Sequence, residues 1–150
     1  MALRKSVLDA VLRVARLREQ QAAAQAQRER KRLLDALSAA TQLDQFAAEY
    51  RNDLSRLMQQ GESSVGLVQN TFEFSRRLEA TAEQQRETSE PLKELVVQAG
   101  KVHQSYKLRL DGLEKIERME KRRALQELFA RESRETEDSV SSRLFRRVAT

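Results

Sequence analysis

The chain has 150 residues, of which 39% are hydrophobic and 34% are charged, and its formal net charge is +5. So large a charged fraction disfavours a globular core, whereas abundant helix formers, only four Gly and a single Pro favour an elongated helical protein. The absence of Cys excludes disulfides and thiolate metal sites, and no run of about 18 apolar residues predicts a membrane span.

A heptad pattern runs through the first part of the chain. Alternate steps of four and three residues, from Leu8 to Leu57, meet an apolar residue at every position except Glu19 and Glu29. This period predicts a left-handed coiled coil and a first helix over about residues 3 to 59. The Arg-rich start resembles an organellar transit peptide, but the pattern continues through it without a break, which favours the helix.

Residues 60 to 64 interrupt the heptad pattern and predict a turn. Gly61 can adopt the left-handed conformation that ends a helix, and Ser63 or Ser64 can cap the next helix by accepting hydrogen bonds from its free amides. So short a connection requires antiparallel neighbours. The sequence therefore predicts an all-α fold class, in which residues 1–150 form one elongated antiparallel coiled-coil hairpin, monomeric on its own.

The expected register pairs residues whose numbers add to about 121. This sum places Ala47 opposite Phe74 and Leu43 opposite Leu78, so that large side chains face small ones. Thr81 lies on the same predicted seam, and its polar side chain predicts thin packing there.

The second helix is expected over about residues 65 to 138. Pro91 predicts a kink near residues 87 to 91, and the alternative is a helix break with Ser89 as the cap of a new helix. Residues from 121 onward have no partner in the register, and residues 139–150, rich in Ser and Arg, are expected to fray. A short apolar stripe in this overhang is either solvated or a docking surface, and it consists of Leu125, Leu128 and Phe129.

Charge is distributed unevenly along the chain. Residues 1–32 have a net charge of +6, residues 33–90 of −5 and residues 91–150 of +4. A hairpin would join the two basic segments into a basic base and leave an acidic tip at the turn. The basic base is expected to include Arg28, Arg30, Lys31, Arg32, Lys121, Arg122 and Arg123. Interleaved acids and the lack of an aromatic platform disfavour nucleic acid as a partner and favour an acidic protein surface or an anionic membrane.

The sequence predicts no catalytic site, metal or cofactor. His103 is the single histidine, and no Cys or second His is present to share a metal ion with it. A phosphate-binding glycine loop is also missing, so neither an enzyme nor a small-molecule substrate is expected.

The residues around the turn resemble a known family. Tyr50 to Leu54, followed by Met58, Gly61, Gln69, Phe74 and Leu78, is similar to the middle of the FliJ family of flagellar export proteins, which has YscO-type relatives in virulence secretion. The resemblance implies a non-enzymatic component of the flagellar type III export apparatus, cytoplasmic and peripheral to the inner membrane at the base of the flagellum. It implies a coiled-coil stalk in the hexameric export ATPase (FliI type) that promotes ring assembly and contacts the export gate membrane protein (FlhA type) and empty export chaperones.

The resemblance also implies partner-binding residues. The export-gate contact of the family maps onto Phe74, Leu78, Thr81 and Gln85, whereas the predicted seam would bury Phe74 and Leu78 against the first helix. Phe72, on nearly the opposite side of the same helix, is the alternative exposed candidate. Two other functions remain open at this point, a generic coiled-coil adaptor or scaffold and a basic binder of nucleic acid or membrane surfaces.

Overall fold

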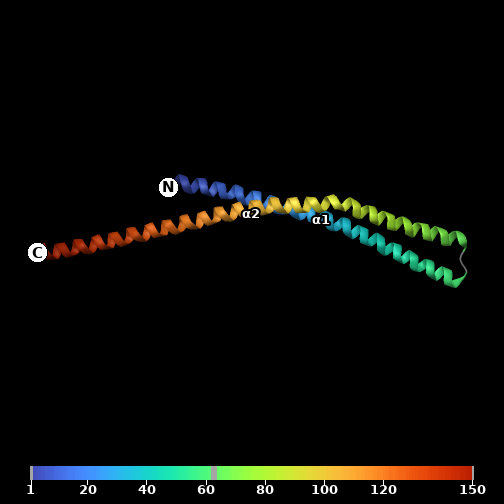
Figure 1. The fold of residues 1–150 in the computed structure, drawn as a ribbon. Helices are drawn as coiled ribbons and strands as arrows, with labels where there is room; N and C mark the ends of the chain where they lie inside the picture. Colours follow the sequence, from blue (N-terminus) through green and yellow to red (C-terminus); the bar gives the residue numbers. More distant parts are fainter. Residues whose placement is uncertain (1, 62–63, 150) are drawn as a thin grey trace. The chain divides into compact units, whose positions relative to one another are not determined.

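The structure, a computed structural model, describes residues 2–61 and 64–149. Helix α1 spans Ala2–Gln60 and helix α2 spans Val65–Ala149, and the described residues contain no strand (Figure 1). The two helices run antiparallel and pack against each other, so the predicted all-α hairpin is confirmed. Packing divides the chain into two units, which are described separately below. Unit 1 comprises residues 1–18 and 106–150, and unit 2 comprises residues 19–105.

The turn has the conformation that its residues favour. Gly61 directly follows α1 with a φ of 68°, a left-handed value that costs glycine nothing because it has no Cβ. At the start of α2 the Leu67 amide donates to Ser64 Oγ (3.2 Å) and the Val68 amide donates to the Ser64 carbonyl (3.2 Å). Ser64 therefore caps α2. Ser63, the other predicted cap, lies outside the described residues.

Helix α2 passes through Pro91 without interruption, so the alternative of a helix break at this point is wrong. Ser89 does not cap a new helix, because its side chain is buried and its hydroxyl donates to the Arg86 carbonyl (2.6 Å). A proline inside a helix costs about 3 kcal/mol, and the packing of this region against α1 offsets that cost. The kink near residues 87 to 91 stays a prediction.

Helix α2 also continues to Ala149, whereas fraying was expected over residues 139–150. The serines of this segment are only mildly unfavourable in a helix. Arg146 and Arg147 lie in the last turn, where positive charge interacts favourably with the helix dipole. The described part of this segment is therefore helical, and fraying of its end stays a prediction.

In unit 2, the seam of α1 lies where the heptad pattern predicted it. Ala22, Ala26, Ala40 and Ala47 are buried, and all four are positions of the predicted seam. Tyr50 is the exception, since its side chain is exposed although the pattern places it in the seam.

The seam of α2 in unit 2 differs from the prediction at every second position. The buried residues are Ser75, Ala82 and Ser89, spaced by seven, whereas the predicted seam contained Phe74 and Thr81, both of which are exposed. Small side chains allow two helices to approach more closely than large ones do. The alanines of α1 therefore pack against the Ser and Ala stripe of α2, and the adjacent large residues are displaced to the edge of the interface.

Ion pairs connect the two helices in each unit. Asp44 pairs with Arg86, and Arg51 pairs with Glu79, both in unit 2, and the residue numbers of each pair add to 130. Each of these residues directly follows a seam residue, so the pairs flank the seam on one side, whereas the contact between the seam residues Glu19 and His103 in unit 2 gives a sum of 122. In unit 1, the Arg16 Nε–Glu114 Oε1 pair (3.8 Å) gives the same sum of 130. The predicted sum of about 121 is close to that of the Glu19–His103 seam contact, and what differs from the prediction is which residues of α2 occupy the seam.

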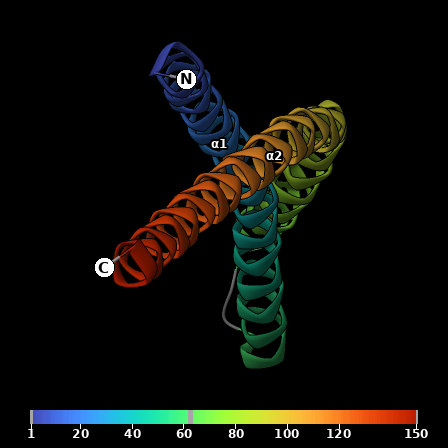
Figure 2. The same cartoon turned by 90° about the vertical axis from the view of Figure 1, so that its left-hand side faces the viewer.

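In unit 1, α2 extends beyond the start of α1, as Figures 1 and 2 both show. Every residue from 118 to 149 is exposed, including the Leu125, Leu128 and Phe129 stripe. The overhang that the register arithmetic predicted is therefore present as helix.

Candidate functional site

An aromatic face borders the seam in unit 2. Phe46, Tyr50 and Phe74 are all exposed, and the Tyr50 and Phe74 rings meet edge to face with their centroids 4.9 Å apart and an interplanar angle of 81°. This is a favourable geometry for an aromatic pair. We call Phe46, Tyr50 and Phe74 the aromatic face.

The heptad phase explains why these rings are accessible. Phe46 directly precedes the buried Ala47, and Phe74 directly precedes the buried Ser75, so both flank the seam on the same side. Within unit 2, α1 and α2 move apart toward the turn (Figure 1), which leaves Tyr50 partly open beside Phe74. The three rings are thus held at the edge of the interface, with one part packed and one part facing outward.

The predicted partner-binding residues divide into two groups. Phe74 is 44% exposed and Thr81 is exposed, with the Thr81 hydroxyl donating to the Arg77 carbonyl (2.8 Å). Leu78 and Gln85 are half-buried at seam positions. The predicted burial of Phe74 is therefore wrong, and the conflict between a seam position and a binding role disappears for this residue.

Phe72 is also accessible, but on the other side of the α2 seam. Its side chain is 49% exposed, and the Arg76 guanidinium lies 5.8 Å from the ring centroid. Since Phe72 directly follows a seam position and Phe74 precedes one, the two rings flank the seam on opposite sides. Phe72 is thus a matched counterpart of Phe74 outside the aromatic face.

The side of the seam opposite the aromatic face is charged. It contains the Asp44–Arg86 and Arg51–Glu79 ion pairs, and Arg86 Nη1 also lies 3.4 Å from Glu83 Oε2. Phe72 flanks the seam on this same side, so the charged pairs and one exposed ring share it.

Sequence reasoning missed Phe46 and Tyr50 as members of a surface. Tyr50 was assigned to the seam because it fits the heptad, and Phe46 was not singled out. The signal that could have found them is their spacing of four residues, which places two large rings on one helical face beside the buried seam alanine Ala47.

The predicted basic base is divided between the two units. Arg28, Arg30, Lys31 and Arg32 belong to unit 2, where Arg28 Nη2 donates to Gln25 Oε1 (2.6 Å) and Arg32 Nη1 lies 3.5 Å from Glu29 Oε2. The remaining cluster belongs to unit 1 and consists of Lys121, Arg122 and Arg123.

In that unit 1 cluster, Lys121 Nζ lies 3.4 Å from Glu117 Oε1, and Arg123 Nε lies 3.7 Å from Glu127 Oε1. Ion pairs one turn apart are typical of a solvated helix surface.

The side chain of His103 in α2 contacts a side chain of α1. Its Nε2 lies 2.9 Å from Glu19 Oε1, and both side chains are half-buried at seam positions of unit 2. Among the residues that the structure describes, no group of three or more His, Cys, Asp or Glu side chains could hold a metal ion. No helix in the described ranges is both long and apolar enough to cross a membrane.

A two-helix coiled coil with an exposed aromatic face and a charged edge belongs to the class of coiled-coil interaction proteins. The chain belongs to the FliJ family, since the family model for the flagellar FliJ protein matches residues 4–150. The resemblance inferred from the residues around the turn is thereby confirmed. Membership makes the protein a structural component of the flagellar export apparatus. Neither the curated proteins nor the solved structures gave a match.

Proposed function

We propose that the protein is a non-enzymatic stalk of the flagellar type III export apparatus and contacts the export gate membrane protein through its aromatic face. The observation that supports this role is the exposure of Phe74 beside Tyr50, at the position where the family resemblance expects the gate contact. Thr81 lies on the same edge of α2 one heptad further along and extends the proposed contact.

Physical considerations favour a protein partner for this face. Aromatic rings are enriched among the residues that dominate binding free energy, because each buries a large apolar area with little loss of side-chain entropy. The Tyr50–Phe74 pair is already ordered by its own ring contact, so less conformational freedom is lost on binding. A groove or helix of the partner that covers both rings would remove them from water.

The overhang of α2 supports the second part of the proposal, insertion in the hexameric export ATPase. Residues 118 to 149 form continuous helix and are exposed throughout, so their side chains are accessible to surrounding ring subunits. We propose that this insertion promotes assembly of the ring and that the protein also binds empty export chaperones. In this proposal it acts in the cytoplasm, peripheral to the inner membrane at the base of the flagellum.

The decisive experiment measures binding of Phe74→Ala to the purified cytoplasmic domain of the export gate protein. We expect at least a tenfold loss of affinity by calorimetry, since a central aromatic residue contributes about 2 kcal/mol or more. Phe72→Ala is the matched control, because it removes an equally exposed ring from the other side of α2. Equal losses for the two variants, or no loss for Phe74→Ala, would contradict the proposed face.

The ATPase part is tested separately. Addition of the wild-type protein to the export ATPase is expected to increase hexamer formation and ATP turnover. The Phe74→Ala variant should retain this effect, since the Phe74 side chain lies in unit 2 and the overhang lies in unit 1. A wild-type protein without any effect on assembly or turnover would favour a generic coiled-coil scaffold.

A further inference from the structure

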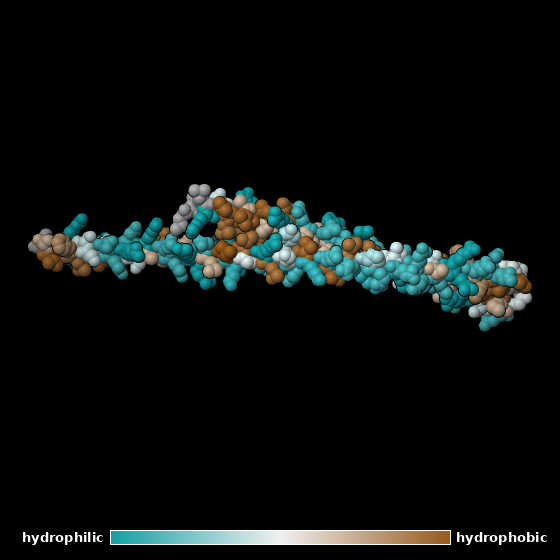
Figure 3. All heavy atoms as spheres, turned by 45° about the horizontal axis from the view of Figure 1, so that its top comes forward, coloured by the Kyte–Doolittle hydropathy of each residue, from teal (hydrophilic) through white to brown (hydrophobic). Residues whose placement is uncertain are grey.

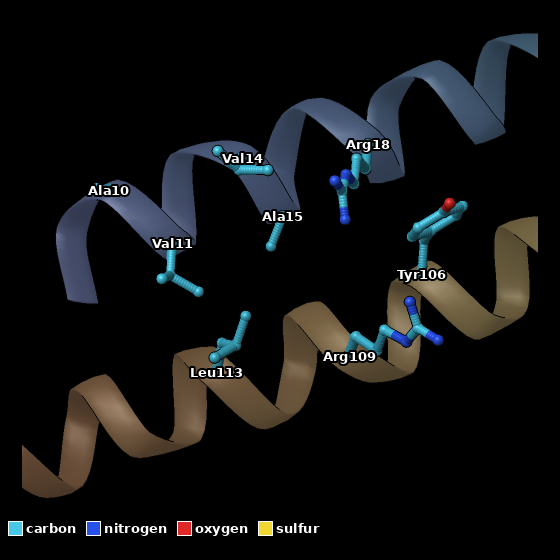
Figure 4. Close-up of a pocket in the computed structure, with 8 residues that line it drawn as sticks. All are labelled: Ala10, Val11, Val14, Ala15, Arg18, Tyr106, Arg109 and Leu113. Atoms are coloured by element: carbon cyan, nitrogen blue, oxygen red, sulfur yellow. The ribbon is translucent and has the colours of Figure 1, made fainter. Parts of the chain in front are cut away.

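An apolar groove follows the N-terminal part of α1 in unit 1. Two hollows of about 320 and 400 Å³ share Val11 of α1 and Leu113 of α2, so they form one groove. In Figure 4, Val11 and Ala15 of α1 and Leu113 of α2 point into the space between the helices. Figure 3 shows apolar atoms gathered over this part of α1. The groove is thus an open apolar surface beside the packed seam.

Helix α1 contributes a second heptad stripe to this groove. Val7, Val11 and Val14 line it at steps of four and three residues and are 59%, 43% and 49% exposed. In the seam that faces α2, Leu12 is buried, whereas the half-buried seam residues Leu8 and Ala15 also line the groove. A single heptad stripe suffices for a two-helix coiled coil, so the valine stripe is available for another helix.

Helix α2 lines the same groove. Its lining residues are Tyr106 and Leu113, which are half-buried seam residues of α2, and the exposed Arg109 between them. The seam is therefore open on this side, and a third helix that packs along the valine stripe of α1 would also cover Tyr106 and Leu113. From Arg4 to Arg18 the groove follows four turns of α1, or about 20 Å at 1.5 Å per residue.

The charged residues that line the groove indicate which kind of helix would bind there. Arg4, Arg18 and Arg109 line the groove, whereas no carboxylate does. The Arg109 guanidinium lies 5.6 Å from the Tyr106 ring centroid, which places positive charge directly beside the apolar floor. A third helix with carboxylates on both flanks of its apolar stripe would complement this rim.

The overhang of a second copy does not meet these requirements. Its exposed apolar residues form two short groups, neither of which covers the four turns of α1 that the groove follows: Leu125, Leu128 and Phe129, and then Val140, Leu144, Phe145 and Val148. The complement must therefore come from a longer amphipathic helix.

We propose that the groove formed by Val7, Val11, Val14, Tyr106 and Leu113 docks an acidic amphipathic helix of a partner protein as the third helix of a coiled coil. The occupant has apolar residues at heptad spacing over about three heptads and Glu or Asp at the flanking positions. This site lies in unit 1 and is separate from the aromatic face of unit 2, so the inference goes beyond the proposed function.

The test uses the full chain and two synthetic probes labelled with fluorescein. Both are three-heptad peptides with Leu at the a and d positions, and they differ in having only Glu or only Lys at the e and g positions. Like charges at these positions disfavour pairing of each peptide with itself. Fluorescence anisotropy at low salt should show binding of the Glu peptide at micromolar concentration and at least tenfold weaker binding of the Lys peptide.

Substitutions in the groove should change this preference in opposite ways. Val14→Asp places a charge on the apolar floor and should weaken the Glu peptide at least tenfold. The double variant Arg18→Glu with Arg109→Glu should weaken the Glu peptide and strengthen the Lys peptide. Circular dichroism should show unchanged helix content, since these side chains are exposed or half-buried at the edge of the seam.

Two matched controls lie on the same helix outside the groove. Leu17→Asp and Arg13→Glu alter exposed residues that do not line it, and both should bind the Glu peptide as the wild type does. Equal affinity for the two peptides, no binding of the Glu peptide, or equal losses for Leu17→Asp and Val14→Asp would each overturn the proposal. Cosedimentation with phosphatidylglycerol vesicles that Val14→Asp abolishes, without binding of the Glu peptide, would assign the groove to a lipid surface and also overturn it.

Discussion

Leucine substitutions at Thr81 and Ala82 distinguish the observed seam from the one that the sequence predicted. In the structure Ala82 is completely buried at the α1–α2 interface and Thr81 is exposed. Ala82→Leu must therefore insert a much larger side chain between closely packed helices, and overpacking of this kind typically costs about 1–3 kcal/mol. Thr81→Leu changes an edge position and should stabilise α2 slightly, by up to about 0.5 kcal/mol from its higher helix propensity.

Urea denaturation followed by circular dichroism measures both changes. With a slope of about 1–3 kcal/mol per molar urea, the Ala82→Leu midpoint should fall by several tenths of a molar unit or more, and the Thr81→Leu midpoint should stay equal or rise. The predicted register has the opposite consequence, since Leu at a thinly packed seam position 81 would add core packing and Leu at 82 would be neutral. A strongly stabilised Thr81→Leu together with an unchanged Ala82→Leu would therefore refute the observed seam.

Two further predictions concern single residues of unit 2 and of the turn. Glu29 is 8% exposed, and its Oε2 has no hydrogen bond, only an ion pair with the exposed Arg32 (3.5 Å). Because the apolar area gained in the seam outweighs so weak a pair, Glu29→Leu should raise the free energy of unfolding by about 1–2 kcal/mol, and a lower thermal midpoint would contradict this account of the seam. Gly61→Ala should lower the free energy of unfolding by about 1–2 kcal/mol because alanine is strained at a φ of 68°, whereas Gly61→Asn should lower it less. An unchanged urea midpoint for Gly61→Ala would show that the turn relaxes at no cost.

The α1 seam could be predicted from the sequence because its residues stand out by apolarity. Ala22, Ala26 and Ala40 recur at heptad positions amid polar neighbours, and each is buried. The turn could be predicted for a similar reason, since Gly61 interrupts a long run of helix formers and supplies the left-handed conformation. Both signals are local, and neither depends on knowing the partner helix.

The α2 seam could not be predicted by apolarity, because its most buried residues include Ser75 and Ser89. Larger apolar residues such as Phe74 lie one position away, so a pattern search based on apolarity assigns the seam to them instead. The choice between a seam through Phe74 and a seam through Ser75 depends on how closely the two helices approach each other. That distance depends on the alanines of α1 as well as on the residues of α2. The same reasoning explains Pro91, whose intrinsic cost is local but whose compensation comes from packing across the interface.

Because small residues occupy much of the seam, many large apolar residues of the chain lie outside it. Leu12 is the one large apolar residue among the buried residues of the described chain, whereas phenylalanines, valines and leucines are exposed on both helices. Hydrophobic stabilisation scales with the apolar area removed from water. The isolated hairpin therefore buries only part of the apolar area that its side chains could remove from water. A partner that covers the aromatic face or the valine groove would add the rest, and binding would then stabilise the folded hairpin. This accounts physically for the two binding surfaces proposed above, in a protein that the FliJ family assigns to the flagellar export apparatus.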